Sequence, residues 1–259
     1  MISFPDLRDK TIWVTGGAGY LGTPIVQALD TIGAKTVCID LPGKADALCK
    51  DHQLEHTFAE SADLCDPDGV PGIVSELAET YGTPDGFVHL AFASSSGKTL
   101  DELGAGDFQK TMEGSLTASF LLSRSVSALM DRRGAGSVVL FASMYGMVPP
   151  DPAMYINTMK PNPIDYGVAK AGTLQMMRYL AVHHGPRGVR FNCVTPGAFP
   201  NPKAQSANPG FSELQKKKIP LARLGEAPEI VGPTLFLLSN SSSYITGHSL
   251  VVDGGWTTW

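Results

Sequence analysis

The sequence predicts a single α/β domain, residues 1–259, built on a doubly wound parallel sheet of about seven strands with helices on both faces. Short apolar runs alternate with helical patterns along the whole chain, as the β-α units of a parallel sheet require. The apolar runs show little polar alternation, which is typical of strands covered on both faces. The length of 259 residues fits one domain of this class.

The short apolar runs predict the strands, and the patterns between them predict the helices. The expected strands are Thr11–Thr15, Lys35–Asp40, about His56–Ala62, Gly86–Phe92, Ser137–Ser143, Val189–Thr195 and Ser249–Asp253. The expected helices are Leu21–Ile32, Val70–Tyr81, Asp107–Asp131, Tyr166–His183 and Ala227–Leu238. The last helix carries Pro228 in its first turn and Glu229 just after, which is typical of a helix start. Because crossovers between parallel strands are right-handed, binding residues are expected at the carboxyl ends of the strands.

Two segments interrupt this alternation. Residues 144–165 are rich in Pro and Met, and residues 201–221 are polar and contain Pro and a run of Lys. Long connections of this kind are usually functional. We expect both segments to be substrate-facing loops.

Composition and charge argue against several classes of protein. The net charge is -5 and the longest basic run is Lys216–Lys218, so a nucleic-acid partner is not expected. No apolar stretch reaches about 18 residues, and the first residues lead straight into a predicted strand without a basic and apolar leader. The four cysteines show no C-x-x-C spacing. These features predict a cytoplasmic protein with reduced, structural cysteines and no membrane segment.

A glycine-rich turn follows the first predicted strand. The run TGGAGYLG, residues 15–22, contains Gly17-x-Gly19-x-x-Gly22 and also Gly16-x-x-Gly19-x-x-Gly22. A tight strand-to-helix turn needs unusual backbone dihedrals, and a pyrophosphate must approach the amides at the helix N-terminus without a Cβ in the way. Since this turn lies in the first β-α-β unit, it predicts dinucleotide binding rather than a merely structural turn.

An acidic residue near this turn bears on the choice of nucleotide. Asp40 ends the second predicted strand, where a carboxylate accepts hydrogen bonds from the adenosine ribose hydroxyls and repels a 2′-phosphate. We therefore predict NAD, with NADP less favoured; Lys44 is the nearby cation that can accommodate a phosphate. Asp63 and Leu64 follow the third strand, where an Asp either bonds the adenine amine or caps the next helix.

A phenol and an ammonium lie one helical turn apart in the segment Tyr166-Gly-Val-Ala-Lys170. This helix follows a predicted strand that ends in Ser143, and the next strand ends at Thr195-Pro196-Gly197. The topology therefore brings the three segments toward one crevice.

With these motifs in place, the sequence resembles the short-chain dehydrogenase/reductase family over essentially its whole length. The matching pieces are TGGAGYLG, Asp40, Asp63-Leu64, ASMYG, YGVAK, NCVTPG, RLGEAPEIVGPTLFLLSN and ITGHSLVVDGGW. The resemblance implies a Rossmann-type fold, a nicotinamide cofactor, a catalytic set of Ser143, Tyr166 and Lys170, and a homotetramer or homodimer assembled through two long helices. The cofactor-binding residues it implies are Gly16, Gly19, Tyr20, Leu21, Gly22, Asp40, Leu41, Asp63, Leu64, Ala91, Phe92, Tyr166, Lys170, Pro196, Gly197 and Phe199.

The chemistry of the catalytic set follows from general principles. Reduction of a carbonyl places negative charge on oxygen, and a positioned donor must supply a proton; the reverse reaction needs a base. A free tyrosine titrates near pH 10, and a cation within about 4 to 6 Å lowers the pKa of its phenol by about 1 to 3 units. Lys170 is expected to do this and to bind the nicotinamide ribose, while Ser143 holds the substrate oxygen.

The sequence departs from the family pattern at three places. His89-Leu90-Ala91-Phe92 replaces the classical Asn-Asn-Ala-Gly and, like the glycine turn, is closer to the extended, sugar-nucleotide branch. Ser115 stands where the catalytic relay Asn is usual, with less reach than an amide. Tyr155 has the classical spacing from Ser143 but lacks a Lys four residues on, so we predict that Tyr166 is the acid/base and Tyr155 a pocket residue.

Three histidines carry weaker signals. His89 can contact the cofactor, although a histidine in an apolar strand is more often a hydrogen-bonded core residue. His52 and His56 are spaced like metal ligands on one helix face, but no third ligand accompanies them. We therefore predict no metal site.

These features predict an NAD-dependent oxidoreductase that interconverts a secondary alcohol and a ketone on a small polar substrate. The inserted loop and the ending GGWTTW look similar to a subgroup that acts in bacterial surface-sugar pathways, so a sugar is one candidate substrate. Two alternatives stay open: a sugar epimerase or dehydratase that retains its NAD, and a catalytically silent dinucleotide-binding protein. The complete set of Ser143, Tyr166 and Lys170 argues against the silent protein, and a structure with a trapped ligand or a substrate panel followed at the nicotinamide absorbance would identify the substrate.

Overall fold

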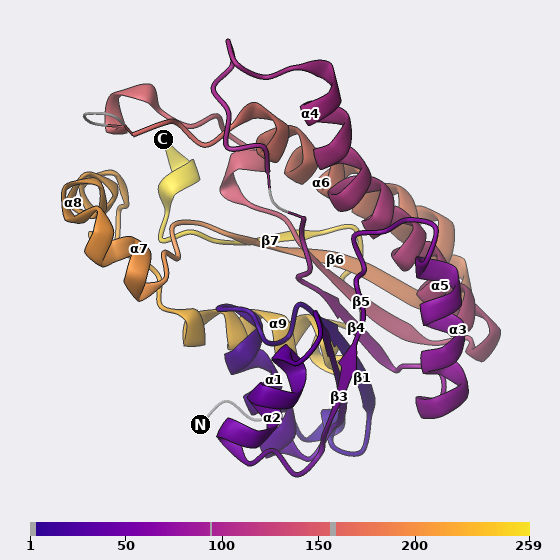
Figure 1. Ribbon diagram of the computed structural model, residues 1–259. Helices are drawn as coiled ribbons and strands as arrows, with labels where there is room; N and C mark the ends of the chain where they lie inside the picture. The colour runs from indigo at the N-terminus through magenta and orange to yellow at the C-terminus, as the bar shows by residue number, and fades with distance from the viewer. Residues whose placement is uncertain (1–3, 94, 156–158) are drawn as a thin grey trace.

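The computed structural model describes residues 4–93, 95–155 and 159–259 and contains one parallel sheet with the strand order β3-β2-β1-β4-β5-β6-β7 (Figure 1). The strands are β1 Thr11–Thr15, β2 Lys35–Asp40, β3 Thr57–Ser61, β4 Gly86–His89, β5 Gly136–Phe141, β6 Val189–Pro196 and β7 Ser249–Val252. The helices are α1 Gly22–Ile32, α2 Lys44–His52, α3 Val70–Tyr81, α4 Ala105–Thr111, α5 Ala118–Arg133, α6 Ile164–His184, α7 Pro202–Ala207, α8 Pro209–Lys218 and α9 Val231–Leu238. The predicted doubly wound sheet is confirmed.

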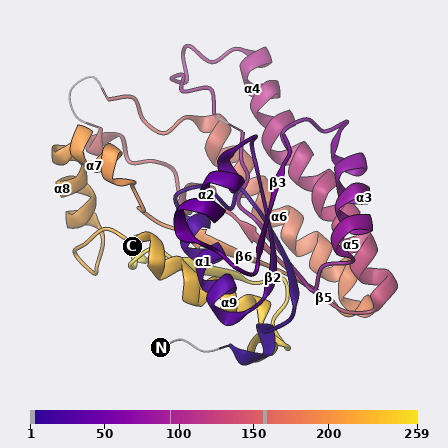
Figure 2. The same ribbon diagram turned by 60° about the horizontal axis from the view of Figure 1, so that its bottom comes forward.

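Each face of the sheet has its own hydrophobic core, which explains why the strands lack polar alternation. Successive residues of a strand point to opposite faces. In β1, Trp13 therefore packs on the face covered by α3, α5 and α6, and Ile12 and Val14 pack under α1, α2 and α9. Figures 1 and 2 show these two groups of helices on opposite sides of the sheet. Both faces need apolar side chains, so the strands read as continuous apolar runs.

The topology places a crevice at the carboxyl end of β1. The chain passes from β1 outward to β2 and β3, then returns to pair β4 on the other side of β1, where Thr15 lies opposite His89. The order of strands reverses at this point, and ligands of open α/β sheets bind there. The loops after β1, β4, β5 and β6 border this crevice.

Several elements begin or end differently from the prediction. β4 ends at His89 instead of Phe92, so Leu90, Ala91 and Phe92 leave the sheet toward the crevice. β5 ends at Phe141, two residues before Ser143. Helix α6 begins at Ile164, two residues before the predicted start.

Three helices were not predicted. Helix α2 covers Lys44–His52, so His52 ends a helix while His56 lies beyond it, and the two do not share a helix face. The segment 201–221, which was expected to be a loop, contains α7 and α8, each with a proline in its first turn. In the segment 144–165, the described residues form short 3-10 turns at Met144–Gly146 and Pro152–Met154 before α6 begins, and residues 156–158 lie outside the description.

The predicted helix 107–131 has an irregular middle. Its α-helical ends, α4 and α5, are joined by a π-helical segment at Met112–Thr117. Such wider turns often mark functional sites.

Across the described part of the chain, no helix combines the length and apolar character that a membrane crossing requires.

Candidate active site

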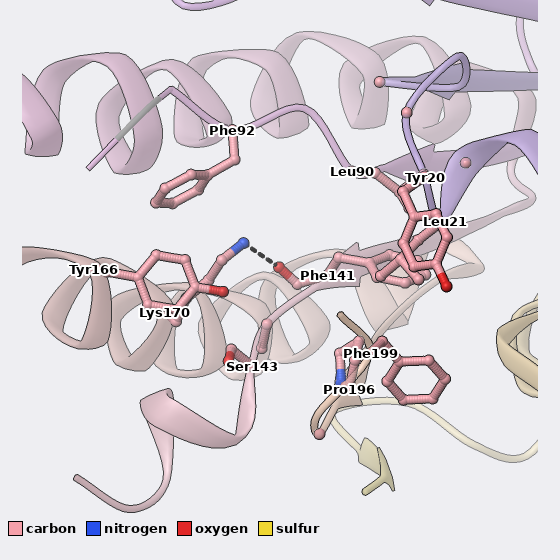
Figure 3. A pocket seen from close by; sticks show the side chains of 15 residues that line it. Tyr20, Leu21, Leu90, Phe92, Phe141, Ser143, Tyr166, Lys170, Pro196 and Phe199 are labelled. Carbon is pink, nitrogen blue, oxygen red and sulfur yellow. Dashed lines mark hydrogen bonds between the residues drawn. The ribbon is translucent and has the colours of Figure 1, made fainter. Parts of the chain in front are cut away.

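A cavity of about 350 Å³ lies at the carboxyl ends of the strands (Figure 3). Its wall is formed by the glycine turn, the loop after β4, the ends of β5 and β6 with the residues that follow them, and helix α6. The predicted site residues that line it are Gly16, Gly19, Tyr20, Leu21, Gly22, Phe92, Ser143, Tyr166, Lys170, Pro196, Gly197 and Phe199. Leu90, Phe141 and Ala142 also line it, and no motif predicted them because they are apolar residues at strand ends.

The glycine turn forms a cradle that larger side chains would fill. Gly16 has φ +68°, and a Cβ on it would lie 2.8 Å from the amide nitrogen of Ala91. A Cβ on Gly22 would collide with the carbonyl oxygen of Gly16. Among the described residues, no side chain caps the start of α1, so its first amides can take an anion. The turn therefore fits the pyrophosphate of a dinucleotide.

Asp40 joins the end of β2 to this turn. Its carboxylate accepts hydrogen bonds from the amides of Ala18 at 3.0 Å and Leu41 at 2.8 Å, and the Lys44 ammonium lies 3.9 Å from it. Two amides leave part of the carboxylate's capacity for further donors. Asp40 and Leu41 lie beside the cavity rather than in its wall.

Asp63 and Leu64 do not reach the cavity wall in this structure. The exposed Asp63 carboxylate accepts from the Cys65 amide at 2.9 Å and caps that turn, whereas α3 begins only at Val70. The side chain of Leu64 is buried in the core beside α3. Their predicted adenine contact therefore stays a prediction.

Ser143, Tyr166 and Lys170 come together on the same cavity wall (Figure 3). Ser143 has an extended backbone, and its hydroxyl accepts from the Tyr145 amide at 3.2 Å. Burial raises the pKa of Tyr166, and hydrogen bonding to the Ser143 hydroxyl partly opposes this rise. Tyr166 and Lys170 lie one turn apart on α6 and both line the cavity, while their catalytic roles stay predictions.

The Lys170 ammonium is buried and bonded to the sheet. Its Nζ donates to the backbone carbonyl of Phe141 at 2.9 Å, and it lies 5.9 Å from the centre of the Tyr166 ring. Burial lowers the pKa of Lys170 to about 8, and Cys193 acts weakly in the opposite direction. The pKa of Tyr166 is moved in this structure by burial and by the Ser143 hydroxyl, and the lowering of that pKa expected from Lys170 stays a prediction.

Asp165, directly before Tyr166, anchors the start of α6. This fully buried carboxylate accepts from the Ser96 amide at 2.8 Å and from the Thr111 hydroxyl at 2.7 Å. Burial raises the pKa of Asp165, but these hydrogen bonds outweigh it and hold the pKa below its usual range. Asp165 therefore fixes the helix end that carries Tyr166, a role for which the sequence offered no signal.

His89 lies in the interior. Its ring nitrogens bond the hydroxyls of Thr15 and Ser119, each at 2.7 Å, and burial lowers its pKa to about 3. His89 is therefore a neutral, hydrogen-bonded core histidine, which is the more common of the two roles that the sequence predicts for it.

Ser115 lies in the π-helical segment, away from the cavity wall. Its backbone carbonyl accepts from the Ser119 hydroxyl. Its own hydroxyl is buried and has no hydrogen-bond partner among the described residues. Ordered water is a common partner for such a group.

Tyr155 lines a second cavity, of about 450 Å³, which shares Ser143 and Tyr166 with the first. The Tyr155 hydroxyl is 3.0 Å from the Tyr145 hydroxyl, and its ring lies 5.1 Å from that of Phe211. This placement agrees with the predicted role of Tyr155 as a pocket residue.

Comparison with known proteins gives the chain its family. The sequence model of a family described as enoyl-(acyl carrier protein) reductase matches residues 17–257. A sorbose reductase from Candida albicans is 28% identical over 255 residues, covering 97% of this chain and 88% of the relative. An NAD-dependent glycerol dehydrogenase from Listeria innocua is 27% identical over 257 residues, covering 97% and 95%.

Solved structures agree with the fold. A short chain dehydrogenase from Leptospira borgpetersenii with bound NAD+ has a TM-score of 0.85 at 29% identity, covering 97% of this chain and 94% of that one. A gluconate 5-dehydrogenase from Burkholderia cenocepacia, in complex with NADP and tartrate, has a TM-score of 0.87 at 23% identity, covering 100% and 99%, and supports the fold alone. With the family match spanning nearly the whole sequence, this chain belongs to the short-chain dehydrogenase/reductase family.

Proposed function

We propose that this protein is an NAD-dependent oxidoreductase that interconverts a secondary alcohol and a ketone on a small polar substrate. The observation that carries the proposal is the placement of Ser143, Tyr166 and Lys170 on one cavity that also reaches the glycine turn. The names of the similar sorbose reductase and glycerol dehydrogenase describe reactions at carbonyl and alcohol groups, which supports the same reaction class here.

Each of the three side chains has its own role in the proposed reaction. A bound nicotinamide supplies or accepts the hydride. Tyr166 gives its phenolic proton to the substrate oxygen during reduction and takes one during oxidation. Lys170 stabilises the resulting phenolate by its charge, and Ser143 donates a hydrogen bond to the substrate oxygen. Ser115 is proposed to hold a water that passes protons toward solvent.

The preference for NAD over NADP rests on Asp40. Its carboxylate is fixed beside the glycine turn by two amides, and it would repel a 2′-phosphate. Lys44 lies 3.9 Å away and offsets part of this charge. The similar Leptospira enzyme was solved with NAD+, which supports the preference.

A polar substrate is favoured by the second cavity, which extends from Ser143 and Tyr166. Asn162 and Gln215 line it, and the Oδ1 of Asn162 and the Oε1 of Gln215 are buried without hydrogen-bond partners among the described residues. An unpaired buried acceptor costs about 1 to 3 kcal/mol. Turned toward the cavity when substrate binds, these two amide oxygens would accept hydrogen bonds from the hydroxyl groups of a polyol or sugar.

A substrate panel followed by nicotinamide absorbance tests this proposal. We expect turnover of ketoses or polyols with NAD(H), and a higher KM for apolar secondary alcohols of matched size. Gln215→Leu is expected to raise KM for the polyol and to leave KM for the apolar alcohol nearly unchanged. No turnover of any substrate by a protein that binds NADH would instead favour the silent dinucleotide-binding alternative.

A sugar epimerase or dehydratase is the second candidate. The glycine turn and His89-Leu90-Ala91-Phe92, which resemble the extended branch, favour it. Such an enzyme retains its cofactor, so the nucleotide would stay with the purified protein and substrate would rearrange without net change in nicotinamide absorbance. Rapid exchange of bound NAD with added NADH would contradict this alternative.

Assembly and location are also proposed. Phe120 on α5 and Tyr179 and Val182 on α6 are partly or largely exposed, with Val182 at 80%. We propose that these helices form the interface of a homodimer or homotetramer, which light scattering would measure. All four cysteines are free thiols, including the partly exposed Cys49 and Cys65, which supports a reducing compartment, the cytoplasm.

A further inference from the structure

Phe92 lies against both members of the Tyr166–Lys170 pair (Figure 3). The centre of its ring is 4.3 Å from the Lys170 Nζ, within the range of a cation–π interaction. The ring meets the Tyr166 ring nearly edge-on, with 5.2 Å between centres and an interplanar angle of 74°. One aromatic side chain from the loop after β4 therefore contacts two functional groups on α6.

The backbone around Phe92 is held on two sides. A Cβ on Gly16 would lie 2.8 Å from the Ala91 amide, and a Cβ on Gly114 would lie 2.8 Å from the Ala93 Cβ. The segment 91–93 is therefore pressed between the glycine turn and the π-helical segment. This close packing limits where the Phe92 side chain can go.

Within the described residues, the Lys170 ammonium forms no salt bridge. The titratable groups that face it are His89 on β4, Cys193 on β6 and Tyr166 on its own helix. Burial lowers the pKa of His89 to about 3 and raises that of Cys193 to about 12, so both are neutral near pH 7. No carboxylate of the described residues pairs with Lys170. The Phe141 carbonyl and the Phe92 ring are the groups that compensate its charge.

We propose that Phe92 is a positioning residue that holds Lys170 protonated and in place through the face of its ring and restrains Tyr166 through its edge. This inference rests on the proposed function, in which Lys170 supports the Tyr166 phenolate. A merely structural Phe92 would fill space, and any apolar side chain of similar size would replace it. If Phe92 instead acts through the charge distribution of its ring, only another aromatic side chain can replace it.

The test compares Phe92→Leu with Phe92→Tyr. Leucine keeps apolar volume and removes the ring, whereas tyrosine keeps the ring. Phe58→Leu is a matched control, because the Phe58 ring also lies near a lysine, with 5.7 Å between its centre and the Lys35 Nζ. Phe58 belongs to the edge strand β3 and does not line the cavity. We expect Phe92→Leu to lower kcat about three- to thirtyfold. We also expect the alkaline limb of the pH profile of kcat to shift to lower pH. Phe92→Tyr is expected to restore most of the kcat and of the pH profile that Phe92→Leu loses, and Phe58→Leu is expected to change neither.

A measurement that requires no catalysis tests the role of Phe92 independently of the proposed function. The side-chain NMR signal of Lys170, assigned with Lys170→Arg, reports its titration directly. We expect its midpoint to fall in Phe92→Leu and to return in Phe92→Tyr. Equal midpoints in all three proteins, or equal losses in both Phe92 variants, would overturn the positioning role. An unaltered protein that shows the expected titrations but turns over no substrate would contradict only the proposed function.

Discussion

Lys170 on α6 donates a hydrogen bond to the backbone carbonyl of Phe141, the last residue of β5, with 2.9 Å between Nζ and O. Ser143 follows the same strand by two residues. Because β5 pairs with β4 on one side and β6 on the other, its end is fixed by the centre of the sheet. The ammonium and the substrate-facing hydroxyl therefore share one rigid support.

The first prediction concerns the cost of the buried Lys170. Its folded pKa of about 8 lies below the value of about 10.4 for an unfolded lysine. Between these values the unfolded chain binds more protons, so the free energy of unfolding rises as pH increases from 8 to 10.4. At pH 7 the buried charge costs on the order of 3 kcal/mol.

Lys170→Met should therefore be inactive but more stable than the unaltered protein at pH 7, by about 1 to 3 kcal/mol. Its free energy of unfolding should not rise between pH 8 and 10.4. Urea unfolding at several pH values measures this. The exposed Lys203 gives the control Lys203→Met. A Lys170→Met protein that is less stable at pH 7 would show that the Phe141 and Phe92 contacts outweigh the burial cost.

The second prediction separates the two candidate phenols. Tyr166→Phe should lower kcat by about 10²- to 10⁴-fold and leave the Kd for NADH nearly unchanged, since only a hydroxyl is removed. Tyr155→Phe should be mild, because the Tyr155 hydroxyl bonds Tyr145 instead of a cation. Steady-state kinetics and calorimetry measure both. The reverse ranking would assign the acid/base role to the segment 144–165.

The third prediction concerns cofactor choice. The Asp40 carboxylate should make NADH bind at least tenfold more tightly than NADPH, which corresponds to about 1.4 kcal/mol. Asp40→Ala should narrow this gap mainly by improving NADPH binding, as calorimetry would show. Asp40→Asn is the control that removes the charge and keeps an acceptor for the Ala18 amide. Equal affinities in the unaltered protein would reject the NAD assignment.

The fourth prediction concerns Ser115. Its buried hydroxyl lacks a protein partner among the described residues, which fits an ordered water in a proton relay. Ser115→Asn should raise kcat where proton transfer limits the rate, with little change in the Kd for NADH. Thermal unfolding is measured alongside. A variant that is no faster and loses about 1 to 3 kcal/mol of stability would show that Ser115 only packs the helix.

The sequence predicted the sheet and the main helices because apolar residues recur there with clear spacing. Helix α2 was missed because its Lys44–His52 segment is mostly polar and buries few residues, so its pattern carries little periodic signal. Helices α7 and α8 were missed for a related reason, since their Pro and Lys content is also typical of loops.

At the site, motif spacing predicted the residues that share a strand end or a helix turn, such as Tyr166 and Lys170. It could not predict contacts between distant segments. The bond of His89 to Thr15 depends on the pairing of β4 with β1, and its bond to Ser119 depends on where α5 lies. The Phe92 ring over Lys170 depends on how the loop after β4 meets α6. Such pairings become visible only in three dimensions.

The Asp165 carboxylate has a consequence for redesign and for evolutionary change. It ties the loop at Ser96, the end of α4 at Thr111 and the helix turn that carries Tyr166 to a single point. Insertions or exchanges in the segment 95–111 would therefore disturb the alignment of the phenol together with the shape of the pocket. Helix α8, which carries Gln215 and is separate from that anchor, is the better place to search for variants with a new substrate range and an undamaged acid/base group.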